Sequence, residues 1–336
     1  MAGVVKAVDL PGVNEVAGAP GGARAWLDER EVRRRAGESL SAGLTRELWK
    51  YTPIKGFLES LADSTAGEAP ALVNADQNGV RAVPLNALDA ADEALVRRLA
   101  AERIDPERHP VADLALLRAA NGWLIEVSGQ ISRPLEIHYP GSGVAPVFVL
   151  LAVNASLTLV EHLNGTGFLA QVTHVELAAG ARLSHHRAAL QKDVPHYSLH
   201  SIYLEQNAAY RLNQNCVGGK RRRSEVHVVL AGPGAEVDMA GAYLVEDGTH
   251  LDQQLVVEHR AGHTVSRQKF HGIGAGKGRS VFNGRIHIHR HAPQSDAVLS
   301  NKNLALHKDA EMNTKPELEI YTDDVRCAHG ATVGQL

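Results

Sequence analysis

The stretch Asn154-Ala155-Ser156-Leu157-Thr158-Leu159-Val160-Glu161-His162 decides the fold, because its pattern returns at nearly constant intervals. A turn residue and a small residue precede a strand in which apolar and polar side chains alternate. With separations of 26, 27, 27 and 28 residues, the unit recurs at Gly180-Ala181, Asn207-Ala208, Gly234-Ala235 and Gly262-His263. His291-Ala292 and Asp309-Ala310 fit the period less regularly. A period of this size predicts units that stack and cover one another's apolar faces.

The length of the repeat distinguishes among the stacked folds. Propeller blades need about 40 residues, and leucine-rich repeats need a ladder of Leu and Asn that this chain lacks. Short strands at a period near 27 therefore predict a β-helix with one coil per repeat. Further alternating segments that we expect to be strands are Trp123–Val127, Leu135–Tyr139, Glu225–Leu230 and Arg285–His289.

The hydrophobic pattern of the chain is different before residue 121. Apolar residues recur at helical spacing over residues 25–44, 54–61, 88–103 and 111–120, whereas residues 62–85 are mixed and rich in turns. We therefore expect an N-terminal helical and mixed region over residues 1–120 and a β-helix core domain over residues 121–336. The predicted fold class is mainly β.

Composition excludes several classes of protein. The chain has 336 residues, of which 44% are hydrophobic, so it can bury a substantial core. Its net charge of −3 argues against a nucleic-acid binder, and we expect the basic run Lys220-Arg221-Arg222-Arg223 to be a solvated turn. No stretch approaches the roughly 18 apolar residues of a membrane-spanning helix, and the first ten residues lack a secretion signal. We expect a cytoplasmic protein with no nucleic-acid or membrane partner.

The chain is rich in histidine and poor in cysteine, with 18 histidines and two cysteines. Cys327 and His329 stand two residues apart, so in a strand their side chains point to the same face, about 7 Å apart. Thiolate and imidazole suit iron–sulfur, zinc or copper(I) chemistry, but a closed site needs about four ligands. The pair is therefore either half of a site shared with another chain, or a packed free cysteine beside a hydrogen-bonded histidine.

Other histidines have simpler interpretations. In Ile286-His287-Ile288-His289-Arg290-His291 we expect the isoleucines to face the core and the histidines to form a solvated ladder, although a third ligand from a neighbouring strand would make His-x-His a chelator. His185-His186, His196 and His200 fit strand faces or turns.

Four carboxylates near the end of the chain allow an enzymatic alternative. Glu317, Glu319, Asp323 and Asp324 could be the catalytic acids of a carbohydrate-active β-helix. Aromatic residues that would stack on sugars make up only 4% of the chain, so outward-facing strand and turn residues are the simpler interpretation. The chain lacks a dinucleotide fingerprint, a P-loop and a nucleophile elbow, and nothing marks it as a self-contained enzyme.

The closing motif carries a family resemblance. Residues 313–321, Asn-Thr-Lys-Pro-Glu-Leu-Glu-Ile-Tyr, and residues 323–334, Asp-Asp-Val-Arg-Cys-Ala-His-Gly-Ala-Thr-Val-Gly, resemble the SufB/SufD family of iron–sulfur cluster assembly components, and most closely its SufD branch. Residues 40–336 agree with the family in part, through Trp49–Pro53, Gly241–Val245 with Asp252, Val257–His259, Ser280–Arg285 and Ser300–Leu304.

The resemblance implies a right-handed parallel β-helix, a partner chain of the SufB type and an ATPase of the SufC type. It places the family histidine at His329 and the family cysteine at Cys327, at an interface where a nascent cluster forms with a SufB cysteine. Ala328 replaces the usual serine between them. The sequence ends at Gln335-Leu336, where family members continue into a helical segment that contacts the ATPase, so we expect that segment to be absent and its ATPase contact to be in doubt.

The sequence thus predicts a noncatalytic, SufD-like scaffold. Cys327 and His329 would contribute to an interfacial site that holds iron or an iron–sulfur cluster only transiently, with no resident cofactor. The partners would be a SufB-like subunit, a SufC-like ATPase or a second copy of the chain. The alternatives are a carbohydrate-active β-helix enzyme and a structural homo-oligomer without metal.

Overall fold

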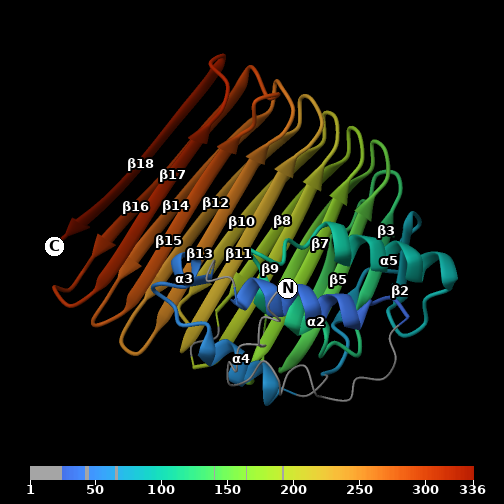
Figure 1. Ribbon diagram of the computed structural model, residues 1–336, viewed down its shortest axis with the longest axis horizontal. Coiled ribbons are helices and arrows are strands. Elements are labelled where there is room, and N and C mark those ends of the chain that lie inside the picture. Colours follow the sequence, from blue (N-terminus) through green and yellow to red (C-terminus); the bar gives the residue numbers. More distant parts are fainter. Residues whose placement is uncertain (1–24, 42–44, 65–66, 140, 164, 191–192) are drawn as a thin grey trace, which may run out of the picture.

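The computed structural model describes residues 25–41, 45–64, 67–139, 141–163, 165–190 and 193–336. Two nine-stranded sheets face each other, with strand orders β1-β4-β6-β8-β10-β12-β14-β16-β18 and β17-β15-β13-β11-β9-β7-β5-β3-β2 (Figure 1). We call them sheet B and sheet A, respectively. From β3 onward all neighbouring strands are parallel, and each coil gives one strand to each sheet, which makes a solenoid of about eight coils. The predicted parallel β-helix is confirmed.

The strands of the solenoid are mostly eight to eleven residues long. Their bounds are β1 Ala71–Val73, β2 Val80–Pro84, β3 Trp123–Val127, β4 Leu135–Tyr139, β5 Gly143–Leu151, β6 Ser156–Leu163, β7 Leu169–Leu177, β8 Arg182–Ala189, β9 Pro195–Leu204, β10 Ala209–Val217, β11 Arg221–Leu230, β12 Glu236–Val245, β13 His250–His259, β14 Val265–Gly274, β15 Arg279–Ile288, β16 Ser295–Ala305, β17 Glu311–Ile320 and β18 Val325–Gln335.

The predicted repeat is one corner of the coil. Asn154, Gly180, Asn207 and Gly234 all have positive φ, and the alanine after each is fully buried. The backbone N–H of each turn residue donates to a carbonyl of the next coil, as Asn154 does to Ala179 at 3.0 Å. These residue types recur because Gly and Asn adopt the left-handed conformation at a smaller cost than most other residues.

The repeat drifts in register towards the C-terminus. The left-handed residue of the next two corners is His263 and then Gln294, not Gly262 and His291 as the spacing predicted. Asp309-Ala310 lies at the opposite corner, between β16 and β17. The loops lengthen there, so the period grows and a fixed spacing loses the register.

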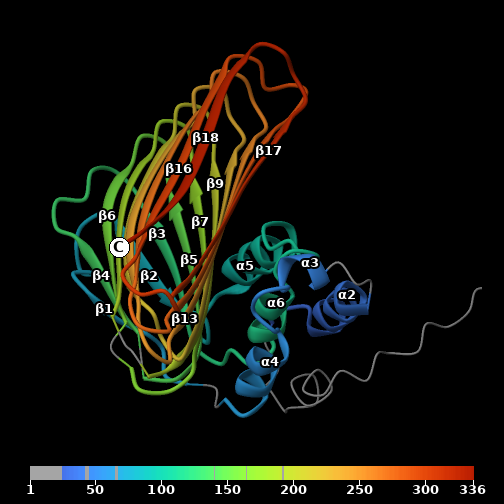
Figure 2. The same cartoon turned by 90° about the vertical axis from the view of Figure 1, so that its left-hand side faces the viewer.

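The helices of the described residues lie on the outer face of sheet A (Figures 1 and 2). They are α2 Glu29–Ser41, α3 Thr45–Leu48, α4 Lys55–Ala62, α5 Ala90–Glu102 and α6 Pro110–Leu116. Where they pack, the outer face of the sheet is apolar, and Phe148, Val172 and Leu199 are buried with helix residues such as Phe57 and Leu114. The helices of the sequence analysis are confirmed within a few residues, and residues 42–44 of the first one lie outside the described part.

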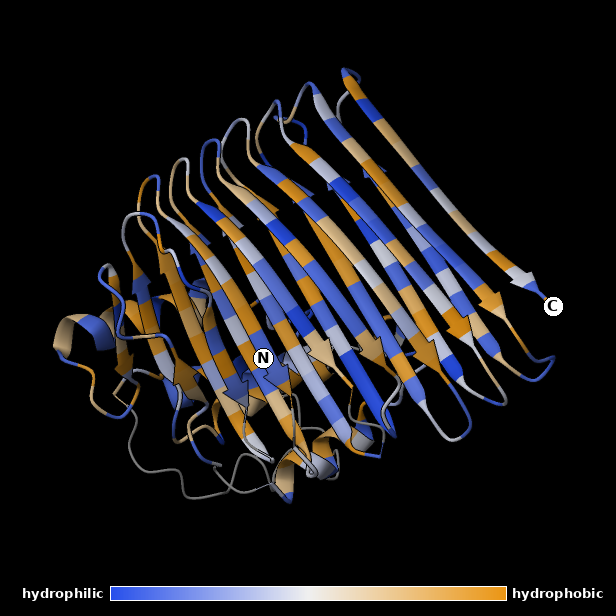
Figure 3. Cartoon of the chain, turned by 180° about the vertical axis from the view of Figure 1, so that it is seen from behind, coloured by the Kyte–Doolittle hydropathy of each residue, from blue (hydrophilic) through white to orange (hydrophobic). Residues whose placement is uncertain are grey.

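The two faces of sheet B differ in character. The face turned away from the helices shows alternating hydrophilic and hydrophobic bands along its strands (Figure 3). In β6, for example, Leu157, Leu159 and Leu163 are buried inside the solenoid while Thr158 and Val160 point outward. Alternation of apolar and polar residues with a period of two is typical of a sheet that has one solvent-exposed face.

Candidate functional site

In the described part of the chain, no further strand covers the C-terminal coil, which is formed by β17 and β18. β17 and β18 are the outermost strands of their sheets, so each has an edge whose backbone groups pair with no other strand in the described part of the chain. The end also exposes apolar side chains, with exposed fractions of 42% for Ile320, 57% for Tyr321 and 49% for Val333. Unpaired strand edges favour pairing with another chain.

β18 places Cys327 and His329 on the side that faces the interior. They lie in register with Ala297 and Leu299 of β16, both buried inside the solenoid. Because no further coil covers them, Cys327 is only half-buried and His329 is exposed. The predicted same-face arrangement is therefore present at the open end.

The environments of the two side chains differ. Burial, with a smaller contribution from Asp296, raises the pKa of the Cys327 thiol. Cys327 also packs against the solenoid core. Among the described residues, nothing forms a hydrogen bond or an ion pair with the His329 side chain. The His329 imidazole is thus accessible, whereas Cys327 is held as a thiol.

A polar cluster that the sequence analysis missed occupies the interior. The Glu161 carboxylate, fully buried on β6, accepts hydrogen bonds from Arg187 Nε at 2.7 Å, Gln171 Nε2 at 3.0 Å and the Tyr139 hydroxyl at 3.0 Å. Burial disfavours the Glu161 charge, but the surrounding histidines and Arg187 outweigh it and hold the pKa of this carboxyl well below its ordinary value.

His200, one of the histidines of this cluster, is neutral. His200 Nε2 lies 3.1 Å from Glu161 Oε2, and burial lowers the pKa of His200 to about 3. Arg187 is therefore the lasting counter-ion at neutral pH. His185, His196 and His200, expected on strand faces or turns, are all buried inside the solenoid.

The basic run is not a solvated turn. Arg221, Arg222 and Arg223 begin β11, and the last two are among the most deeply buried side chains, each 1% exposed. Arg222 points inward, where Nη1 lies 3.2 Å from Cys216 Sγ. The prediction holds only for Lys220, which is exposed before β11. It was wrong for the two buried arginines, because Glu225 and Asp252 pair with Arg223 and the carbonyl oxygens of Ala189 and Val217 accept hydrogen bonds from Arg222.

Arg223 belongs to an ion network beneath the helices. It donates to Glu225 Oε1 and to Asp252 Oδ2, both at 2.5 Å, and its guanidinium lies 3.8 Å from the centre of the Trp49 ring. On the helical side, His109 Nδ1 lies 2.6 Å from Glu225 Oε2. The network therefore joins α6 and the segment around Trp49 to the solenoid.

The Ile286–His291 segment follows its predicted orientation in part. Ile286 and Ile288 are fully buried in the core. His287 and His289 stack with ring centroids 4.1 Å apart, and His289 Nε2 lies 3.2 Å from Glu258 Oε2. The histidines hence contact neighbouring carboxylates and are partly exposed.

The four carboxylates near the end of the chain are either ion-paired or exposed. Arg285 Nη2 binds Glu319 at 2.5 Å and Lys315 Nζ binds Glu317 at 2.6 Å. Asp323 and Asp324 lie exposed in the turn before β18. Ion pairing and exposure agree with the simpler interpretation of these carboxylates as outward-facing strand and turn residues.

The comparisons with known proteins agree with this architecture. Residues 141–336 match the family described as "SUF system FeS cluster assembly, SufBD core domain". The chain belongs to this family. Those residues run from the start of β5 to the end of the chain, so the SufBD core domain comprises most of the solenoid, including the open coil with Cys327 and His329.

The relatives of the chain include SufD and other proteins of the SufBD family. It is 28% identical to "Iron-sulfur cluster assembly protein SufD" of Escherichia coli (strain K12) over 325 residues, covering 86% of this chain and 76% of that protein. It is 30% identical to "Protein ABCI7, chloroplastic" of Arabidopsis thaliana, covering 69% of this chain and 48% of that protein. A SufBD family protein of Mycobacterium leprae is 26% identical, covering 86% of this chain and 76% of its own length. The chain is a SufD-like member of the SufBD family.

The described part of the chain contains no helix with the length and apolar character needed to cross a membrane.

Proposed function

We propose that the chain is a noncatalytic, SufD-like scaffold of iron–sulfur cluster assembly, with the open C-terminal coil as its pairing surface. The observation that carries the proposal is the position of the Cys-x-His pair on the exposed interior side of the last coil. Two donors on a coil that no described strand covers are half of a metal site, and a partner that covers this coil brings the remaining ligands.

The pairing partner is a SufB-like chain, with a second copy of this chain as the alternative. Both would extend the sheets through the free edges of β17 and β18 and cover the apolar side chains Ile320, Tyr321 and Val333. A SufC-like ATPase completes the assembly. The helical region, residues 1–120, would stiffen the solenoid, and residues 121–336 would carry the site, in a cytoplasmic complex.

His329 is the stronger donor of the pair. It is exposed and engages no described neighbour, whereas the Cys327 thiol must lose a proton against a pKa that burial raises. A thiolate is the metal-binding form of cysteine. His329 would therefore receive iron or a nascent cluster, the cargo of the assembly, and Cys327 would join once the partner has changed its surroundings.

Reconstitution with the SufB-like and SufC-like partners tests the ligand assignment. Iron and sulfide are measured in complexes containing the wild-type chain, His329→Ala or His307→Ala, a histidine exposed in the turn before β17. We expect the first variant to assemble but to lose most of the bound cluster, and the control to keep it. Unchanged iron and sulfide in His329→Ala would refute the assignment.

A second variant tests the pairing surface separately. Val333→Lys places a charge on the exposed apolar end of β18, far from the helices. It should weaken partner binding in size-exclusion chromatography while the isolated chain stays folded. Normal complex formation would show that the partner binds elsewhere.

A further inference from the structure

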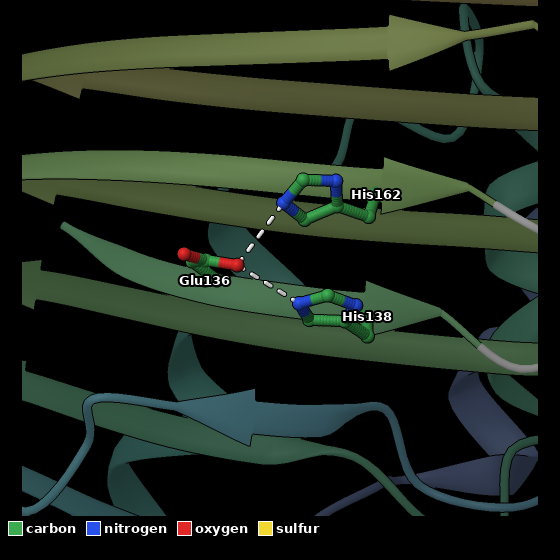
Figure 4. A group of neighbouring side chains, drawn as sticks. All are labelled: Glu136, His138 and His162. Carbon is green, nitrogen blue, oxygen red and sulfur yellow. Dashed lines mark hydrogen bonds and ion pairs between the residues drawn. The ribbon is translucent and has the colours of Figure 1, made fainter.

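Three side chains converge on the outer face of sheet B, away from the C-terminal coil. Glu136 and His138 come from β4 and His162 comes from β6 (Figure 4). Residues two apart on a strand share a face, and His138 and His162 are directly paired across the parallel ladder. The strand register therefore fixes all three side chains on one patch.

The nitrogen atoms of both rings point to one carboxylate oxygen. His138 Nε2 lies 3.0 Å and His162 Nε2 lies 3.2 Å from Glu136 Oε2, and the rings stack with centroids 4.3 Å apart (Figure 4). Only the first contact has hydrogen-bond geometry. His162 Nε2 is shielded from solvent and has no hydrogen-bond partner in the described part of the chain.

The charge balance differs from that of the structural ion pairs in this protein. The ion pairs of Glu136 within the described residues are to the two histidines alone, with no lysine or arginine. His138 and then His162 lower the pKa of the Glu136 carboxyl, so it is an anion at neutral pH. In the interior cluster, by contrast, Arg187 neutralises Glu161 and complete burial shuts ions out.

The distances suit a first-row metal ion. Such ions bind imidazole nitrogen and carboxylate oxygen at about 2.0–2.2 Å. Neighbouring ligands are then roughly 3.0 Å apart in octahedral geometry and roughly 3.4 Å apart in tetrahedral geometry. The two nitrogen–oxygen distances fall within this interval, and all three ligand atoms lie within 4.8 Å of one another.

We propose that Glu136, His138 and His162 form a binding site for a divalent first-row transition metal ion. Two imidazoles and one carboxylate are a ligand set for zinc and for non-haem iron(II), whereas magnesium and calcium prefer oxygen ligands alone. The side chains are each 31–37% exposed, so the remaining coordination positions face solvent. The site does not depend on the proposed function of the C-terminal coil.

Metal titration of the full-length chain tests the proposal. Untagged protein with Cys327→Ser and His329→Ala, which remove donors at the other candidate site, is stripped with a chelator. It is then titrated with Zn²⁺ by calorimetry, with Fe²⁺ under anaerobic conditions, and with Co²⁺ to record its absorption spectrum. Glu136→Gln and His162→Ala are compared with His271→Ala, an exposed histidine on the outer face of the same sheet.

The expected result is one bound ion per chain that excess Mg²⁺ does not displace. Glu136→Gln and His162→Ala should each weaken Zn²⁺ binding at least about tenfold, since losing even an outer-shell partner of a metal ligand costs that much. His271→Ala should bind like the parent. Circular dichroism checks that the variants are folded. The proposal is overturned if the parent binds less than one equivalent, or if both ligand variants bind as tightly as His271→Ala.

Discussion

Glu225 is the residue whose charge we expect to hold the helices against the solenoid. It is 1% exposed, and its two carboxylate oxygens face Arg223 at 2.5 Å, His109 at 2.6 Å and the Tyr197 hydroxyl at 2.8 Å. Glu225→Gln keeps the size of the side chain and removes its charge. The variant therefore isolates the electrostatic part of the attachment.

The expected loss of stability in Glu225→Gln follows from the pKa of the Glu225 carboxyl. Burial disfavours the Glu225 charge, but Arg223 and His109 outweigh it and lower the pKa from 4.5 to about 2. A depression of this size corresponds to about 3 kcal/mol of stability at pH 7. Since the folded-state pKa is the lower one, this stability is present above pH 4.5 and is lost as the pH falls towards 2. At about pH 3 only about 1 kcal/mol should remain.

Urea unfolding at the two pH values measures this difference. Trp49 is 5% exposed and stacks on Arg223, so its fluorescence reports separation of the helices from sheet A. Far-UV circular dichroism follows the strands of the solenoid independently. Glu236→Gln, which changes an exposed glutamate on β12, is the matched control and should alter stability by less than about 0.5 kcal/mol.

We expect Glu225→Gln to lower the free energy of unfolding by about 3 kcal/mol at pH 7 and by much less at pH 3. An equal loss of unfolding free energy at both pH values would mean that the shape of the Glu225 side chain, and not its charge, accounts for the effect. A loss below about 1 kcal/mol at pH 7 would refute the assigned role of the Arg223–His109 pairing.

Three further predictions concern the core, the interior charge and the corner. Phe57→Ala should loosen the helices by about 3–5 kcal/mol, because Phe57 is fully buried against Tyr197, and the fluorescence transition should shift more than the dichroism transition. Arg187→Met should cost about 3–5 kcal/mol in urea unfolding, because it leaves the buried Glu161 charge without its counter-ion; equal stability would show that Glu161 is protonated. Gly180→Ala should cost about 1–3 kcal/mol, since φ is +71° and the new Cβ would meet Asn154 Oδ1 at 2.3 Å. Adding Asn154→Gly should restore part of that loss in thermal melts, and no recovery would contradict the clash.

The local pattern of apolar, polar and turn residues was sufficient to predict the fold. The strands Trp123–Val127 and Leu135–Tyr139 end where the alternation of apolar and polar residues predicted. A strand with one solvent-exposed face and one buried face produces this alternation with a period of two residues. The turn residues Asn154 and Gly180 were found because a left-handed corner restricts the residue type. The later corners were misplaced because loop length, which no pattern fixes, shifted them to His263 and Gln294.

The candidate sites were harder to predict from the sequence than the fold, because they depend on contacts between coils. Cys327 and His329 stood out through their spacing, and strand geometry accounts for their shared face. Arg223 and Glu225 stand two residues apart, as many exposed ion pairs do, and the second partner, Asp252, lies one coil further along the chain, so the local sequence does not indicate that Arg223 is buried. We therefore predicted from composition that the basic run is solvated, whereas Arg223 pairs with carboxylates in the interior of the protein.

The coil register itself is the signal that would have found the missed clusters. Glu161 stands opposite Arg187, Arg223 opposite Asp252, and His138 opposite His162, each in the next coil of the same sheet. In a parallel ladder, residues in register lie side by side, so an alignment of the repeats with one another brings complementary charges together. The same alignment distinguishes two kinds of cluster. Opposite charges in register, as in the first two pairs, satisfy one another, whereas two imidazoles in register beside Glu136 leave an anion without a fixed cation. In this protein the second kind is the better place to look for a metal ion.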